Sequence, residues 1–171
     1  ADYFVQARKP RTEWKKLDDL TAQLAEFDLR CAAGDYDTAA SVLREIDFDY
    51  LLLWGHYRLL IKYYEGLQGK LTSSTTKNRS LNELGMAYHA LGDISQSIKC
   101  YEKALIFVRE EKNRAYEGIL LGNLGLVYAD LGESRKSIEF YEQALVIDRE
   151  ICDLTNERNH LGNLGLAYGD L

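Results

Sequence analysis

Residues 121–132 read LGNLGLVYADLG, and this stretch decides the fold. The same pattern stands 40 residues earlier as LNELGMAYHALG in residues 81–92, and 40 residues later as LGNLGLAYGDL in residues 161–171. The offset is identical both times, so no insertion or deletion separates the three copies. A fixed period of this length is typical of proteins built from stacked supersecondary units.

Each repeat predicts a pair of helices. The apolar residues of the quoted stretch recur at intervals of three and four, which places them on one face of a helix. They are Leu121, Leu124, Val127, Tyr128 and Leu131. Gly132 ends this helix, and a second apolar stripe follows it at Ile138, Tyr141, Ala144, Leu145 and Ile147 or Ile151. Residues 152–156 are mostly polar and start the next helix, so each unit is a helical hairpin.

A glycine recurs inside the first helix of every repeat, at Gly85, Gly125 and Gly165. Glycine within a helix costs roughly 1 kcal/mol relative to alanine. A cost that recurs at one position suggests a packing reason. We expect the missing side chain to let the second helix, with its small Ala104 or Ala144, approach closely.

The first half of the chain lacks the 40-residue register but also predicts helices. An apolar stripe from Trp14 to Cys31 ends near Gly34, and a shorter helix follows. A third helix is expected from Tyr50 to about Gln68, with Asp49 as its N-cap. In total we expect an all-α chain of about eight helices. Its expected segments are an N-terminal flank (1–12), degenerate repeat-like helices (13–72) and repeats of 40-residue period (73–171), the last one truncated.

Composition excludes several classes of protein. The formal net charge of −6 argues against binding to a phosphate backbone, so we expect no nucleic acid partner. No apolar run is long enough to span a membrane. Three cysteines without a CxxC pair argue against a disulfide framework, which favours a cytoplasmic location. The chain begins without Met and ends inside a repeat, so we expect it to be a piece of a longer protein.

Motifs that carry chemistry are weak in this sequence. Residues 66–71 (GLQGKL) are too short for a phosphate-binding loop, and Leu71 replaces the hydroxyl residue that contacts magnesium. His56, His89 and His160 lack metal-binding spacing and are expected at the surface or between helices. No nucleophile motif is present. We therefore expect no enzyme activity, no metal site and no cofactor.

Residues 81–171 resemble the tetratricopeptide repeat (TPR) family, whose pattern is W-x2-L-G-x2-Y, then A-x3-F, then P, on a period of about 34 residues. The L-G-x2-Y motif begins at Leu84, Leu124 and Leu164. Ser-x3-Tyr replaces A-x3-F at residues 97–101 and 137–141. Arginine stands where the proline ends the second helix, so that helix can run further, which accounts for the longer period.

The resemblance implies a right-handed superhelical solenoid of antiparallel hairpins with a concave groove lined by the first helices. The 40-residue variant is similar to Pins/LGN-type adaptors and to the arrays of bacterial STAND-type signalling ATPases. Carried over position by position, the groove-lining residues are Arg79, Asn82, Glu83, Met86 and His89, then Ile119, Asn123, Leu126 and Asp130, then Asn159, Asn163, Leu166 and Asp170.

This resemblance predicts a cytoplasmic scaffold, with a role in signal transduction, that binds a peptide or partner protein in the groove. Asn123 and Asn163 would hold the partner's backbone beside an apolar strip of Met86, Leu126 and Leu166. Alternatively, the two asparagines only tie neighbouring helices together. Two other functions stay open: a sensory or autoinhibitory arm of a nucleotide-dependent ATPase, and self-association through the truncated C-terminal helix.

Overall fold

The computed structural model describes residues 2 to 171, except for the side chains of Asp2 and Val5. The described residues form helices and no strands, as the sequence predicts. They divide into two compact units, of which the first ends at Leu91 and the second begins at Gly92. The expected segment boundary at residue 72 concerns sequence repeats and stays a prediction.

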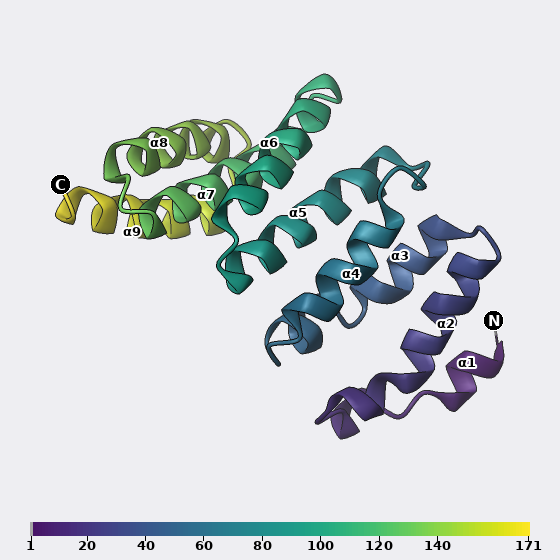
Figure 1. Cartoon of the computed structure of the whole chain (residues 1–171). Coiled ribbons are helices and arrows are strands. Elements are labelled where there is room, and N and C mark those ends of the chain that lie inside the picture. The colour runs from purple at the N-terminus through teal and green to yellow at the C-terminus, as the bar shows by residue number, and fades with distance from the viewer. Residues whose placement is uncertain (1) are drawn as a thin grey trace. The chain divides into compact units, whose positions relative to one another are not determined.

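The first unit contains five α-helices among the described residues (Figure 1). They are α1 (Asp2–Ala7), α2 (Thr21–Ala32), α3 (Tyr36–Arg44), α4 (Tyr57–Leu67) and α5 (Ser74–Leu91). Three short turns of other helix types join them: η1 (Arg11–Glu13), η2 (Leu17–Leu20) and η3 (Asp47–Leu52). Helix α2 packs on α3, and α4 packs on α5. The eight helices α2–α9 match the expected number, and the short α1 lies within the expected flank.

The helix expected from Tyr50 to Gln68 is divided in two. A π-helical turn, η3, ends at Leu52, and α4 begins only at Tyr57, after the left-handed Gly55. Asp49 is therefore not the N-cap of α4, because His56 occupies that position. The apolar spacing that predicted one long helix persists across the break, since both pieces bury residues in the same core.

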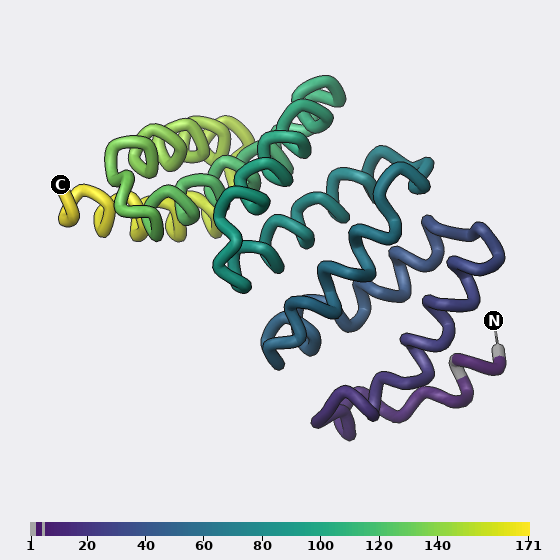
Figure 2. The backbone as a smooth tube through the Cα atoms, viewed as in Figure 1, coloured from purple at the N-terminus to yellow at the C-terminus, as the bar shows by residue number. Residues whose placement is uncertain are grey.

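The second unit consists of four helices of nearly equal length. They are α6 (Ile94–Glu110), α7 (Arg114–Asp130), α8 (Ser134–Glu150) and α9 (Leu154–Gly169). Each packs on the next one along the chain, and α7 also contacts α9. Figure 2 follows the reversal of the backbone at each turn. The predicted second stripe is confirmed, since Tyr141, Ala144 and Leu145 are buried, whereas Leu131, predicted for the first stripe, is exposed.

The glycine inside α7 is a point of close approach between helices. A Cβ atom at Gly125 would lie 2.7 Å from the ring of Tyr141 on α8, well inside normal contact distance. The packing reason expected for this glycine is therefore confirmed, and the group that needs the space is an aromatic ring. Gly165, the equivalent residue on α9, has nothing within 4 Å of the same point.

The turns of the second unit alternate between two kinds, which differ in the residue that adopts the left-handed conformation. After α7, Gly132 adopts a left-handed conformation with φ of 73°, which ends the helix as the sequence predicts. After α6 and α8, the left-handed residues are Lys112 and Cys152, which carry side chains. The next helix then starts at an N-cap whose side chain accepts a backbone hydrogen bond, at Asn113 and Asp153.

The arginines that replace the family's proline link successive hairpins. Arg109 binds Glu117 with an N–O distance of 2.8 Å, and Arg149 binds Glu157 at 2.7 Å. Each pair joins the end of one hairpin's second helix to the start of the following hairpin's first helix. The two pairs lie one repeat apart in the chain. Glu117 is buried, so its ion pair matters more than an exposed pair would.

We predict that Gly125→Ala and Gly165→Ala have opposite effects on stability. At Gly125 the new methyl group collides with the Tyr141 ring, which should lower the free energy of unfolding by about 1–3 kcal/mol. At Gly165 the methyl group enters open space in a helix, which should raise it by up to roughly 1 kcal/mol. Urea titrations of the two variants measure both changes, and equal effects would contradict the packing argument.

Candidate interaction surface

The predicted groove residues fall on three first helices, in two units. Those on α5 belong to the first unit, and those on α7 and α9 belong to the second. The residues of α7 and α9 lie near one another because these two helices are in contact.

Two leucines at the same repeat position are exposed on the second unit. Leu126 on α7 has 41% of its surface exposed, and Leu166 on α9 has 70%. Asn123 and Asn163, three residues earlier on each helix, are half-buried. The α7 and α9 rows also contain the half-buried Ile119, the exposed Asn159, and the exposed Asp130 and Asp170 at the helix ends. The result is a mixed surface of apolar, amide and acidic groups.

Asn163 also contacts the neighbouring helix. Burial raises the pKa of the Tyr141 phenol to about 12, the nearby Asp130 carboxylate adds to this, and a hydrogen bond from Asn163 acts in the opposite direction. The amide of Asn163 on α9 therefore lies near the Tyr141 hydroxyl on α8. A half-buried amide has more than one hydrogen-bonding atom, so this contact leaves capacity for a partner.

Among the candidate residues on α5, the half-buried Glu83 interacts with another carboxylate, that of Asp47. The side chain of Asn82 donates to Glu83 at 3.2 Å, and it also lies 3.5 Å from the sulfur of Met86. Burial raises the pKa of Glu83 to about 7, and the Asp47 carboxylate adds to the shift. Asp47 is buried, and it accepts a hydrogen bond from the hydroxyl of Tyr64 at 2.5 Å. Sequence reasoning placed Glu83 in the groove but did not find Asp47, which lies in the degenerate half.

A buried aspartate–histidine pair in the second unit was not expected. His160 on α9 lies 2.7 Å from Asp148 on α8, measured from Nδ1 to Oδ2, and both side chains are buried. The imidazole rests on Gly122 of α7, where a Cβ atom would lie 2.1 Å from Nε2. The interhelix position expected for His160 is confirmed. Forty residues earlier the same two positions hold Val108 and Leu120, so a comparison of the repeats could have found the pair.

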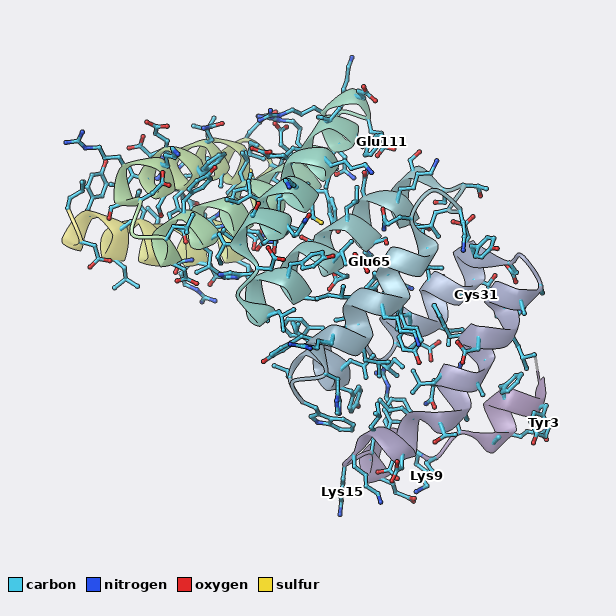
Figure 3. All side chains as sticks on the ribbon, in the orientation of Figure 1. Tyr3, Lys9, Lys15, Cys31, Glu65 and Glu111 are labelled. Carbon is cyan, nitrogen blue, oxygen red and sulfur yellow. The ribbon has the colours of Figure 1, made fainter. Side chains whose placement is uncertain are left out.

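Other kinds of site find little support in the described part of the chain. Residues 2 to 171 contain no group of three or more His, Cys, Asp and Glu side chains arranged to hold a metal ion. No disulfide bond among the described residues involves Cys31, which is labelled in Figure 3, Cys100 or Cys152. Among the described helices, none is both long and apolar enough to cross a membrane.

Comparison with known proteins agrees with the geometry of the hairpins. Residues 76–150 match the model of the family described as tetratricopeptide repeat. This part of the chain is therefore similar to the tetratricopeptide repeat family. TPR regions in general serve as protein-interaction scaffolds and are generally not enzymes, which supports the same broad role here. The finer likeness to Pins/LGN-type adaptors and STAND-type ATPases stays a prediction.

Two solved structures extend the TPR likeness to nearly the whole chain. Both are of a protein of Podospora anserina assigned as a kinesin light chain with nearly identical TPR-like repeats, and one of the two is of a variant form. Each is 18% identical and covers 97% of this chain and 72% of its own chain, with TM-scores of 0.55 and 0.54. At this identity the likeness shows the fold alone. Among curated proteins, none matches the sequence.

We predict that Glu83→Gln stabilises the protein at high pH and not at low pH. The pKa of Glu83 is raised in the folded state from 4.5 to about 7, so folding favours the protonated acid. The stability from this group is complete below about pH 4 and is lost as the pH rises through about 7. Glutamine has no charge to bury, so the variant should gain roughly 1–3 kcal/mol at pH 8.

Urea titrations between pH 4 and pH 8 test this expectation. The control is Glu102→Gln, which removes an exposed carboxylate from α6 and should leave the pH dependence unchanged. A Glu83→Gln variant whose stability follows that of the wild type at every pH would contradict the proposed burial of Glu83.

Proposed function

We propose that the second unit binds an extended segment of a partner protein along α7 and α9. The exposed Leu126 and Leu166 contact apolar side chains of the segment. Asn123 and Asn163 hydrogen-bond its backbone through their side-chain amides. The observation that carries this proposal is the repetition of an exposed leucine and a half-buried asparagine on two adjacent first helices.

The repeat explains why a peptide suits this surface. An extended peptide presents backbone groups at regular intervals, and adjacent helices with the same residues present regular partners for them. Exposed leucine side chains contribute when a partner removes them from water, by roughly 25 cal/mol for each Å² of apolar surface buried. The acidic residues at the helix ends, Asp130 and Asp170, favour a segment with basic residues nearby.

The experiment is a selection of random dodecapeptides displayed on phage against the whole chain. Selected peptides are then measured by fluorescence polarisation with the wild type and with the double variant Leu126→Glu, Leu166→Glu. We expect the variant to bind at least about tenfold more weakly, a change of about 1.4 kcal/mol. Both leucines are exposed, so the variant should keep its thermal stability.

The matched control is Ile106→Glu, Val146→Glu. These residues are similarly exposed and also lie one repeat apart, but on the second helices α6 and α8. We expect this variant to bind the selected peptides as tightly as the wild type. The proposal fails if no peptide is enriched, or if the control variant loses as much affinity as the leucine variant.

A second candidate function, self-association, is favoured by the uncovered side of α9. Leu161 has 45% of its surface exposed, whereas Leu121, its equivalent on α7, has 1% because α8 covers it. Gly162, Gly165 and Gly169 face open space, so another helix can approach α9 closely. A second copy of the chain offers the same surface, which allows a symmetric α9–α9 contact.

Sedimentation equilibrium over a wide range of protein concentrations tests self-association. We expect a concentration-dependent dimer that Leu161→Glu converts to a monomer, because the new charge would be buried in the contact. Val146→Glu, an exposed change on α8, should leave the dimer intact. A monomer at all concentrations, or a dimer insensitive to Leu161→Glu, would remove this candidate.

The sensory arm of a nucleotide-dependent ATPase and the cytoplasmic location stay predictions. The rest of the open reading frame tests the first, since such an arm requires a nucleotide-binding domain in the same protein. Expression with a fluorescent tag tests the second.

A further inference from the structure

A small pocket lies in the first unit, whereas the surface proposed for the partner segment belongs to the second unit. It is formed by α3, α4 and the first two turns of α5, and its volume is about 50 Å³. Its lining residues are Ala40, Ser41, Arg44, Tyr64, Thr75, Thr76, Arg79 and Ser80. Two of these are arginines, from helices that are distant in sequence, and no lining residue is acidic.

The arginines of this pocket have no ion-pair partner among the described residues, unlike others in the same unit. Arg8 binds Glu26 and Glu45, and Arg30 binds Glu26 and Asp35. The described structure shows no ion pair or hydrogen bond for the guanidinium of Arg44 or of Arg79. Arg79 is half-buried, so part of its hydration is already lost without a carboxylate to replace it.

Among the other polar side chains of the pocket, Ser41 and Tyr64 already donate to other groups, whereas three hydroxyls can still donate. The side-chain hydroxyls of Thr75 and Thr76 form no hydrogen bond in the described structure. The hydroxyl of Ser80 accepts from Gln68, which leaves its own proton to donate. A pocket that offers two guanidinium groups and several hydroxyl protons is complementary to an oxyanion.

Nearby acids reduce the positive charge of the pocket without cancelling it. Arg44 and Arg79 both attract the buried Asp47, and Arg79 also attracts Glu83. Asp47 already accepts hydrogen bonds from Tyr64 and from the backbone of Phe48, so its oxygens are directed at those groups. Neither arginine forms an ion pair with Asp47 or Glu83 among the described residues.

We propose that this pocket binds a single phosphate-sized oxyanion, in which the guanidinium groups of Arg44 and Arg79 and the hydroxyls of Thr75 and Thr76 donate to its oxygens. The volume suits one tetrahedral group and excludes a nucleotide, because sites for such ligands measure roughly 300–1,000 Å³. The oxyanion is either free inorganic phosphate or the phosphoryl group of a phosphorylated side chain, and both present the same oxygens.

Titration with inorganic phosphate at constant ionic strength, followed by NMR, tests the proposal. The signals to follow are the side-chain Nε–H groups of Arg44 and Arg79 and the backbone amides of Thr75 and Thr76. We expect saturable shifts confined to these groups. Arg44→Gln, an exposed change at the end of α3, should weaken binding by at least about tenfold while the protein stays folded.

Three further variants test whether binding is specific to the pocket. Arg58→Gln removes an exposed arginine of α4 in the same unit, with the same change in net charge, and should bind phosphate like the wild type. Thr76→Val removes one donor without changing the charge and should weaken binding. Arg79→Gln is informative only if its thermal unfolding matches that of the wild type, because Arg79 stabilises the buried Asp47.

The same titration with O-phosphothreonine separates the two sources. Tighter binding of the phosphoamino acid assigns the pocket to a modified side chain, and tighter binding of inorganic phosphate assigns it to the free ion. Shifts that increase linearly without saturation, or equal binding by Arg44→Gln and Arg58→Gln, would overturn the proposal. The variant Leu126→Glu, Leu166→Glu should bind phosphate normally, so failure of the partner-segment proposal and failure of this one can be told apart.

Discussion

The packing of the second unit depends on the contact between Gly125 and the ring of Tyr141. A helix whose surface carries no side chain at one point allows an aromatic ring to lie directly on its backbone, which brings α8 close to α7. Tyr141 is then almost fully buried, and its hydroxyl lies within reach of Asn163 on α9. One ring thus touches both first helices that flank it, which sets the spacing of the exposed Leu126 and Leu166.

Most of the repeat region could be predicted from sequence because its determinants are local and recur. The period of 40 residues, the glycine at position 132 and the polar start at Asp153 define helices whose ends the structure confirms. The break before α4 could not be predicted in this way, because the apolar spacing continues through it and only Gly55 signals a turn. The pattern around Gly55 occurs only once, so it cannot be compared with a second copy in the chain.

The candidate functional residues show the same contrast between the repeats and the first half of the chain. Residues such as Asn123 and Leu126 were found because a repeat register assigns each position a direction on its helix. The buried Asp47 and the pocket of Arg44 and Arg79 were not. The pocket combines Arg44 of the degenerate half with Arg79 of the first repeat, about 35 positions apart, and no register relates these two helices. Charge pairing between distant helices depends on tertiary structure, and composition alone carries no information about it.

The Asp148–His160 pair makes one helix junction chemically different from the preceding one. Repeats of nearly the same sequence can pair with the wrong copy during folding, and domain swapping is a common result. If α7 took the place of α9 against α8, Leu120 would face the buried carboxylate of Asp148 and leave it without its imidazole. The pair therefore favours the correct arrangement of the repeats, because α9 offers an imidazole to Asp148 where α7 has Leu120.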